Sequence, residues 1–385
     1  MSIQSLRTSS PPGVDYRYSP YRPAMPVFGP SLCSVLVQIP PTGLHRPGAD
    51  AGRVGTKKAQ EPAMRVVSLL PSASEILCAV GGGHLLVGRS HECDHPKSLA
   101  SLPVLTGQRT TYESPAQIDA EVRAQLSTGQ SLYTLDTDLL AELRPDLILT
   151  QDLCEVCSID LNAVRAAAAD IKKKTGHTPE VVSLDPHTIE AVFDDLLRVG
   201  EAVGLADEAM RASVELRGRL HSAQDFVNPY TEGPVVGFME WTDPIFVAGH
   251  WNVQLIERAG GRHPWNPTVA AEDAGAAAGP QMAYRSAGKS KTVTPIEFAA
   301  EGPEYLVIAP CGLDLDQTRA AAEDLQKQDW FQSLPAVKDG NVALVDGNQM
   351  FNRPGPRLVD AFEFLVGFLN DRPGVIPAAF PWEQV

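Results

Sequence analysis

The sequence predicts an α/β protein built from two parallel-sheet lobes that are joined by one long helix. Two observations predict this fold class. Short apolar, β-rich runs alternate with helical patterns in both halves of the chain, and a proline-free helical stretch separates the halves. The length of 385 residues and the 43% hydrophobic content suffice for two packed cores. We therefore expect a first lobe at 65–205, a linking helix at 206–228 and a second lobe at 229–385.

A region of different composition precedes the first lobe. Residues 1–64 contain 10 of the 32 prolines and carry a net charge of +4, whereas residues 65–385 carry −19. No helical or strand period is sustained there, which predicts a disordered extension. Its arginines, serines and scarce acids are compatible with an organellar transit peptide, the alternatives being a disordered tail or a misplaced start, and no secretory signal is recognised. We expect the protein in an organelle (plastid or mitochondrion) or in the cytoplasm.

The first lobe begins with an apolar strand and a helix start signal. Ser72 and Glu75 have the spacing of a capping box ahead of an apolar helix that ends at the glycines 81–83. Parallel strands with covering helices follow from the alternation. The predicted strands are 65–70, 85–88, 146–150 and 180–184, and the later predicted helices are 138–143, 161–173 and 188–203.

The linking helix and the second lobe continue this pattern. The stretch 206–227 contains no proline and a single glycine, Gly218. As a helix it would be about 30 Å long at 1.5 Å per residue. The predicted strands that follow are 235–239, 305–309 and 342–345, and the predicted helices are 252–259, 295–300, 316–327 and 356–369. The stretch 264–291 is rich in Ala, Gly and Ser and is predicted to be an irregular loop.

Charge and motifs exclude several classes of function. The net charge of −15 disfavours nucleic-acid binding, and no apolar run approaches the roughly 20 residues of a transmembrane helix. The sequence has no HExxH, no GxSxG and no dinucleotide GxGxxG after a strand. Gly288-Lys289-Ser290 resembles the end of a P-loop, but position 283 is Ala where the first Gly is required.

Polar and sulfur-containing residues follow the predicted strands. In open parallel sheets the loops at the carboxyl ends of strands line the ligand site, so these residues are the candidates for binding. They occupy 90–95, 151–157, 240–251, 310–312 and 346–355. If the two sheets face each other, the five loops border one site.

Four of these residues have the chemistry of a zinc site. His91, Cys93, Cys154 and Cys157 would provide two nitrogen or sulfur ligands from each of two loops, a set suited to tetrahedral Zn²⁺. Only one CxxC is present, however, so the thiols are alternatively packing or capping residues. A redox dithiol is a third interpretation, and its flanking residues do not resemble those of thioredoxin.

Aromatic and basic residues in the second half are candidates for holding a larger ligand. Trp241 and Trp251 would lay indole faces on a planar or apolar ligand, and on this interpretation removal of Trp251 weakens binding with little loss of stability. His250 is a candidate axial metal ligand, or else a hydrogen-bonded structural residue. Arg353 would clamp a carboxylate or phosphate, or else pair with Asp346 or Asp360.

Seven segments together resemble the cobalamin-binding type of the class III periplasmic substrate-binding proteins, the iron-siderophore and vitamin B12 group. They are RVVSLLPSASEILCAVG, VGRSHECDHP, PDLILTQDLCEVC, VVSLDPHTIEAV, EWTDPIFVAGHW, APCG and DGNQMFNRPGPRLVD, in order from Arg65 to Leu369. The resemblance implies two α/β lobes, one long rigid helix, little domain closure and a ligand held between the lobes. It also implies a protein that delivers its ligand to an ABC importer and catalyses no reaction.

Carried over to this chain, the resemblance implies a set of ligand-binding residues. They are His91, Glu92, Cys93, Asp94, Cys154, Glu155, Trp241, His250, Trp251, Cys311, Asn352 and Arg353. The expected ligand is cobalamin, another corrinoid or a related metal chelate, and zinc is a second candidate.

The sequence departs from this family in two respects. No secretory signal or lipoprotein cysteine is recognised, so the expected partner is an ABC-type importer or an intracellular acceptor, and the 264–291 loop looks longer than usual. Two other functions remain open, a tetrapyrrole metal chelatase-like enzyme and a zinc-binding interaction protein of the same fold.

Overall fold

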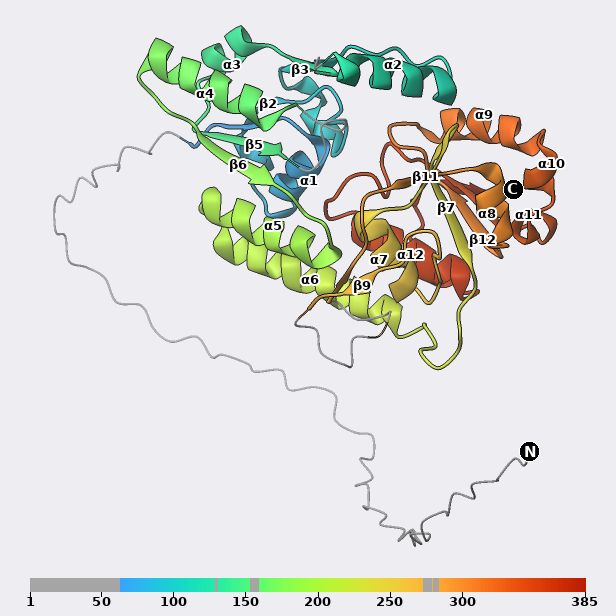
Figure 1. The fold of residues 1–385 in the computed structure, drawn as a ribbon. Helices are drawn as coiled ribbons and strands as arrows, with labels where there is room; N and C mark the ends of the chain where they lie inside the picture. Colours follow the sequence, from blue (N-terminus) through green and yellow to red (C-terminus); the bar gives the residue numbers. More distant parts are fainter. Residues whose placement is uncertain (1–62, 129–130, 153–158, 273–278, 280–283) are drawn as a thin grey trace, which may run out of the picture. The chain divides into compact units, whose positions relative to one another are not determined.

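The computed structural model describes residues 63–128, 131–152, 159–272, 279 and 284–385, all within a compact unit that spans Ala59–Val385 (Figure 1). The predicted extension at 1–64 lies almost entirely outside the described residues, so its disorder remains a prediction. Among the helices that the structure describes, none combines the length and the apolar character that a bilayer crossing requires.

The first lobe contains a four-stranded sheet in which all strands are parallel. The strand order is β2 (Leu86–Arg89), β1 (Val66–Ser68), β5 (Leu147–Gln151) and β6 (Glu180–Leu184). Side chains alternate between the two faces: Val66 packs in one core cluster and Val67 in another. The parallel sheet predicted from the alternation of strands and helices is therefore confirmed.

Helices cover both faces of this sheet. One face packs on α1 (Pro71–Ala79) and α5 (Ile189–Ala202), and the other packs on α3 (Thr137–Leu143) and α4 (Leu161–Thr175) (Figure 1). The remaining elements are η1 (Gly83–Leu85), η2 (Lys97–Ser101), α2 (Pro115–Ser127) and the antiparallel pair β3 (Thr106–Gln108) and β4 (Tyr133–Leu135). Sequence periodicity missed α2 because only Pro115 of this helix is buried, so it has no apolar stripe.

The capping box predicted at Ser72 and Glu75 does not form. Helix α1 begins two residues earlier than a Ser72 cap implies, at Pro71, and its N-cap Leu70 makes no side-chain cap hydrogen bond. Proline suits this first position because it lacks the N–H that would need a partner. Ser72 lies inside the helix, and Glu75 is buried against arginines of the second lobe. The prediction was wrong because a distant ion pair, rather than a local bond, satisfies the Glu75 carboxylate.

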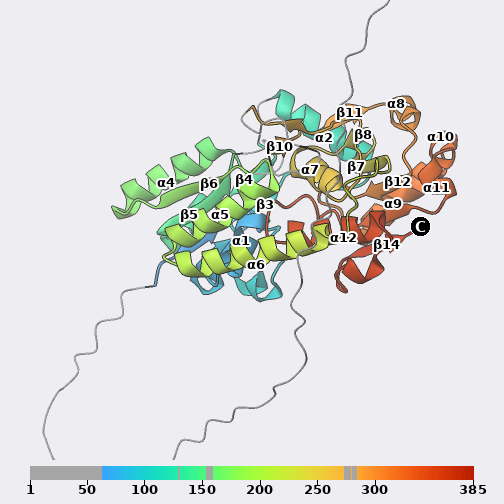
Figure 2. The same cartoon turned by 90° about the horizontal axis from the view of Figure 1, so that it is seen from below.

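Helix α6 (Ala206–Gln224) connects the two lobes. Its 19 residues span about 28 Å, close to the predicted length. Leu216 and Leu220 are buried in the core that α6 shares with α5 and with α12 (Leu358–Leu369). Figure 2 shows α6 extending from beneath α1 and α5 toward α12. The long linking helix is thus present, and it packs on elements of both lobes.

The second lobe contains a six-stranded mixed sheet. Its central strands β7 (Val236–Thr242), β12 (Tyr305–Ile308) and β13 (Val342–Val345) are parallel, as predicted. Three antiparallel strands that the sequence analysis did not predict complete it: β8 (Ile245–Val247), β11 (Lys291–Val293) and β14 (Trp382–Gln384). The order is β11-β8-β7-β12-β13-β14. Each of the three added strands has only three residues, too few for a two-residue period to be recognised.

Helices and one short antiparallel pair of strands accompany this sheet. The helices are α7 (His250–Arg258), α8 (Pro295–Ala300), α9 (Leu315–Gln326), α10 (Asp329–Gln332), α11 (Pro335–Lys338), α12 and η3 (Pro373–Val375). Capping boxes begin α8, through Thr294 and Glu297, and α9, through Asp314 and Gln317. The described parts of the predicted loop 264–291 contain the antiparallel pair β9 (Val269–Ala270) and β10 (Arg285–Ser286).

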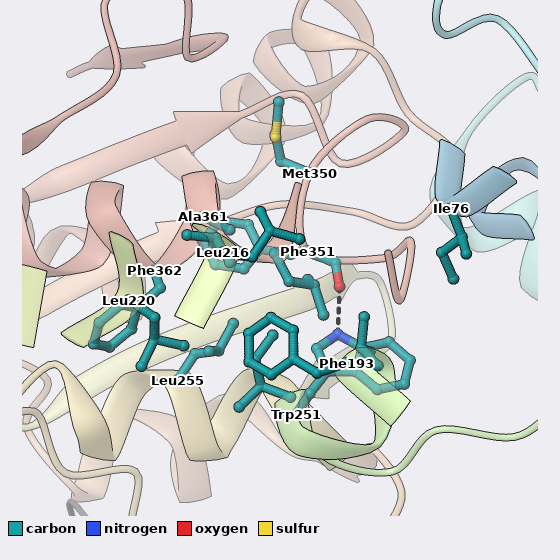
Figure 3. Packing of buried hydrophobic residues seen from close by; sticks show 14 of the residues in the cluster. Ile76, Phe193, Leu216, Leu220, Trp251, Leu255, Met350, Phe351, Ala361 and Phe362 are labelled. Atoms are coloured by element: carbon teal, nitrogen blue, oxygen red, sulfur yellow. Dashed lines mark hydrogen bonds between the residues drawn. The ribbon is translucent and has the colours of Figure 1, made fainter. Parts of the chain in front are cut away.

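One hydrophobic core runs through both lobes. Ile76 and Phe193 of the first lobe, Leu216 of α6, and Trp251 and Phe362 of the second lobe belong to the same cluster of buried side chains (Figure 3). Because the interior of a protein is densely packed, relative movement of the lobes would open voids in this cluster. The shared core therefore resists separation of the lobes.

Two helical glycines test how closely the helices pack. A Cβ atom on Gly200 of α5 would lie 2.2 Å from Cβ of Ala209 in α6, whereas a Cβ on the exposed Gly218 would meet nothing within 4 Å. We expect Gly218→Ala to raise the free energy of unfolding by about 0.5–1 kcal/mol and Gly200→Ala to lower it by about 1–3 kcal/mol. Urea unfolding followed by circular dichroism measures both. Equal stabilisation by the two substitutions would show that α5 and α6 are not in close contact.

Candidate functional site

His91 lies in the turn that follows β2, at the carboxyl end of the first sheet. Its backbone N–H donates to Thr106 Oγ1 at 3.0 Å, and its ring Nδ1 lies 2.7 Å from the same oxygen. The ring Nε2 is buried and has no hydrogen-bond partner among the described residues. Burial, and next the charge of Arg89, lower the pKa of His91, so the ring is neutral near pH 7 and can offer a lone pair.

Cys93 is a buried thiol in the same turn. It is 1% exposed, and its Sγ lies 3.0 Å from Ser74 Oγ. Burial raises the pKa of Cys93 to about 11 despite the Ser74 hydrogen bond, so the protonated thiol prevails at neutral pH. In this arrangement Cys93 is a packing residue.

The structure does not test the predicted zinc site as a whole. Cys154, Glu155 and Cys157 lie outside the described residues. Within the described part of the chain, no group of three or more His, Cys, Asp or Glu side chains is arranged to hold a metal ion. The four-residue zinc site remains a prediction.

Arg353 links the second lobe to the first through a buried ion-pair network. Its Nη1 lies 2.6 Å from Asp94 Oδ1 and 3.3 Å from Glu75 Oε1, and its Nη2 donates to Asp94 Oδ2 at 3.1 Å. Arg357 completes the network with its Nη2 2.6 Å from Glu75 Oε1. Arg353 is 5% exposed, so these carboxylates already occupy its guanidinium group.

Neither interpretation offered for Arg353 is correct. It does not pair with Asp346, whose carboxylate accepts from Gln349, or with Asp360, which pairs with Arg219. It is also not a free clamp for a ligand anion. The sequence could not indicate its true partner because Asp94 lies 259 residues away and is brought close only by the contact between lobes.

The two acidic residues of the turn differ in their protonation behaviour. Burial would raise the pKa of Asp94, but the hydrogen bonds and charge of Arg353 together hold it below its usual value. For Glu92 burial prevails, reinforced by Asp94 and opposed by Arg353, and its pKa is raised. Asp94 is therefore the ionised partner of Arg353.

Asn352 and Cys311 lie at the carboxyl ends of the second sheet. Asn352 Nδ2 donates to the carbonyls of Gly347 and Ala309, at 2.7 and 3.1 Å, and thereby ties the loop after β13 to the loop after β12. Cys311 is exposed, and its backbone N–H donates to Glu240 O. Asn352 thus has a structural role, while the Cys311 thiol is accessible.

Trp241 and Trp251 occupy different environments, although the sequence analysis treated them as a pair. The partly exposed Trp241 lies on the β7–β8 hairpin, and its Nε1 donates to Pro115 O of the first lobe and to Asp243 O, both at 3.1 Å. Trp251 is 7% exposed, and its Nε1 donates to Phe351 O at 2.7 Å within the shared core (Figure 3). The ligand-stacking role predicted for Trp251 is therefore corrected, because its indole is enclosed by core side chains.

His250 faces a histidine of the other lobe that the sequence analysis missed. Its Nδ1 lies 3.2 Å from Nδ1 of His187, and the two ring centroids are 5.1 Å apart. His187 is exposed, and it follows β6 just as His91 follows β2. The rule that polar residues after parallel strands form sites would have found it in the segment Asp185-Pro186-His187.

Glu240, which the sequence placed in a candidate loop without a specific role, organises the backbone around His250. Its carboxylate accepts hydrogen bonds from Gly249 N at 3.2 Å, from Asn252 Nδ2 at 2.8 Å and from Ser290 Oγ. Burial raises the pKa of Glu240, and these three bonds oppose the shift. The residue connects β7, the start of α7 and the end of the 264–291 loop.

A surface cavity lies apart from these loops. It has a volume of about 600 Å³ and is formed by one lobe, between β6 and the second half of α5. Its lining residues include Glu180, Ser183, Arg198 and Glu201, and none of the candidate binding residues. We therefore place the candidate site at the strand-end loops, where residues of both lobes contact each other.

The fold has two α/β lobes and a connecting helix, and its polar loops meet at the carboxyl ends of parallel strands. This architecture defines a ligand-binding protein of the class III type. The family model described as periplasmic binding protein matches residues 66–348, and the chain belongs to this family. Periplasmic binding proteins are non-catalytic ligand-binding proteins, which disfavours the chelatase interpretation. The curated proteins contain no match to the chain.

Solved structures share the fold. A periplasmic heme-binding protein from Pseudomonas aeruginosa is 23% identical, with a TM-score of 0.56 and coverage of 83% of this chain and 97% of its own. The periplasmic vitamin B12-binding protein BtuF of Vibrio cholerae is 18% identical, with a TM-score of 0.55 and coverages of 81% and 98%. An ABC transporter substrate-binding protein from Listeria monocytogenes is 17% identical, with a TM-score of 0.53 and coverages of 80% and 100%. These likenesses show the predicted two-lobed fold.

The core position of Trp251 leads to a stability prediction. We expect Trp251→Ala to lower the free energy of unfolding by about 3–5 kcal/mol, because it opens a cavity and leaves Phe351 O without its donor. Trp251→Phe should cost less, since it keeps a ring and loses only the hydrogen bond. Trp241→Ala is the matched comparison at a partly exposed tryptophan. Denaturant unfolding of the three variants checks the order, and an unchanged midpoint for Trp251→Ala would contradict the core assignment.

Proposed function

We propose that the protein is a non-catalytic binding protein for a metal chelate, with a corrinoid such as cobalamin as the first candidate, held by the strand-end loops of the two lobes. The observation that carries the proposal is the His187–His250 pair. The pair places two imidazoles from different lobes together at the loops where proteins of this architecture take their ligands. Imidazole nitrogen is a common ligand of cobalt, iron and copper.

Further residues support a ligand larger than a bare ion. Trp241 presents a partly exposed indole from the β7–β8 hairpin, next to the start of α2. His91 has a buried Nε2 without a described partner, which a polar group of a ligand would satisfy. Indole surface and imidazoles together suit a ligand with an apolar body and a metal or polar centre.

The destination of the ligand is part of the same proposal. One structural relative is described as an ABC transporter substrate-binding protein, which supports handover to an ABC-type importer. An intracellular acceptor in an organelle or the cytoplasm is the other partner that the sequence suggests. The compartment decides between them, and fractionation of cells that express the full chain would identify it.

Equilibrium dialysis of the full chain tests the ligand. The probes are cyanocobalamin, hemin and a ferric catecholate, each at micromolar concentration, where binding requires about −8 kcal/mol. We expect one equivalent of cyanocobalamin to bind. Binding of hemin or the ferric chelate alone would replace the corrinoid and keep the binding function, whereas no binding of any probe would refute the proposal.

Substitution of Trp241 tests the contact with the body of the ligand. We expect Trp241→Ala to weaken binding of the dialysed ligand by about 1–3 kcal/mol because the indole face is lost. Trp241→Phe keeps an aromatic face and should retain most of the affinity, although it loses the hydrogen bond to Pro115 O. Equal affinities of Trp241→Ala and the unaltered protein, measured by the same dialysis, would remove Trp241 from the site.

A further inference from the structure

We infer that His187 and His250 form a two-imidazole site that binds a transition-metal ion through two neighbouring coordination positions, with Asp185 as the carboxylate that orients His187. The inference rests on the proposed function in placing a metal at these loops. It goes further in assigning the ligating atoms and in not requiring a chelating ring.

The distance between the two nitrogens fits this coordination. Two nitrogens bound to one metal at about 2.0–2.1 Å lie about 2.9–3.4 Å apart when they occupy neighbouring positions. The two Nδ1 atoms are 3.2 Å apart. Binding through both Nδ1 atoms requires each ring to carry its proton on Nε2.

Asp185 lies on the side of His187 where a metal-bound histidine commonly has a carboxylate partner. Its Oδ1 is 3.6 Å from Nε2 of His187, on the ring nitrogen opposite to the proposed ligating atom. Metal-bound histidines commonly donate the other ring N–H to a carboxylate, which holds the ring in place and makes it a stronger ligand. His187 therefore has the surroundings of a metal-binding histidine.

The backbone holds His250 in an uncommon conformation. Its φ is +48°, in the left-handed region that non-glycine residues rarely adopt. The His250 N–H donates to Gly288 O at 2.9 Å, and Glu240 accepts from the preceding Gly249 N. A Cβ atom on Gly249 would lie 2.3 Å from Ser290 N, so only glycine permits this approach. Strained residues held by their surroundings occur mainly at functional sites, and here the strain directs one imidazole toward the other lobe.

The pair is accessible to an ion from the solvent. His187 is exposed and His250 is partly exposed, so an ion can reach both rings. Among the described residues no third protein ligand completes the set, so the remaining positions would belong to water or to a chelating molecule.

This geometry distinguishes two kinds of chelate. A planar tetrapyrrole fills four positions around its metal and leaves only the two on opposite faces, about 4.0–4.2 Å apart. One histidine of the pair at most would bind such a metal at the observed spacing. A chelate with fewer donors leaves neighbouring positions free, and both imidazoles would then bind. The number of imidazoles bound to the metal, one or two, therefore distinguishes a tetrapyrrole from a bare or partly chelated ion.

Titration of the full chain with Cu²⁺ tests the site, because imidazole binds copper most strongly among the divalent metals of the first row. Electron paramagnetic resonance shows how many nitrogens bind the ion, and calorimetry gives the affinity. We expect a signal from two nitrogens, and an affinity lower by about tenfold or more in His187→Ala and in His250→Ala. Asp185→Asn should weaken binding by about tenfold.

Control variants make the result decisive. His221→Ala removes an exposed histidine of α6 and should leave the titration unchanged. Cys154→Ser with Cys157→Ser tests whether the thiols bind the copper instead. The inference is overturned if both histidine variants bind Cu²⁺ like the unaltered protein, or if only the cysteine variant loses it. The copper titration contains no chelate. Its result therefore does not depend on whether the protein binds cyanocobalamin or hemin, and the two proposals can fail separately.

Discussion

The contact between the lobes is the constraint on which the rest of the structure depends. A continuous hydrophobic core contains residues of both lobes, and the buried Arg353 pairs with Glu75 and Asp94 of the first lobe. Charges removed from water are costly unless they are closely paired, so each group of this network requires the others. The loop after β13 is thereby held against the loop after β2. The candidate binding residues are positioned by the same contact.

Structural demands and binding compete for the same polar loops. Arg353, Asn352 and Cys93 are engaged in ion pairs, backbone hydrogen bonds or packing, and Trp251 is enclosed in the core. The accessible groups in the described part of the chain include Trp241, His187, His250 and Cys311, the partly exposed His91 and Glu92, and the exposed Asp94, which is paired with Arg353. Within the described part of the chain, the candidate site therefore offers fewer free groups than the sequence suggested, and imidazoles rather than a free guanidinium are prominent among them.

Fold and ligand are decided by different parts of this protein. The parallel sheets, the linking helix and their packing place it in the periplasmic binding protein family. Structures of the same fold are described as binding heme or vitamin B12, at identities below 25%. A shared scaffold with different ligands means that the side chains on the loops determine what is bound. The histidine pair is the feature of these loops from which the ligand of this chain can be argued.

The sequence by itself determined the fold class, the parallel strands of both sheets, most helices, the linking helix and the position of the polar loops. These features follow from local periodicity and from the rule that parallel strands direct their carboxyl ends to one edge. Only the tertiary structure decided which candidate residues are engaged in structural contacts. Glu75 pairs with Arg353 across 278 positions, and Trp251 packs in the core. It also brought His187 to His250, 63 positions apart. Burial and pairing between distant residues depend on how the lobes pack, and no local pattern in the sequence contains that information.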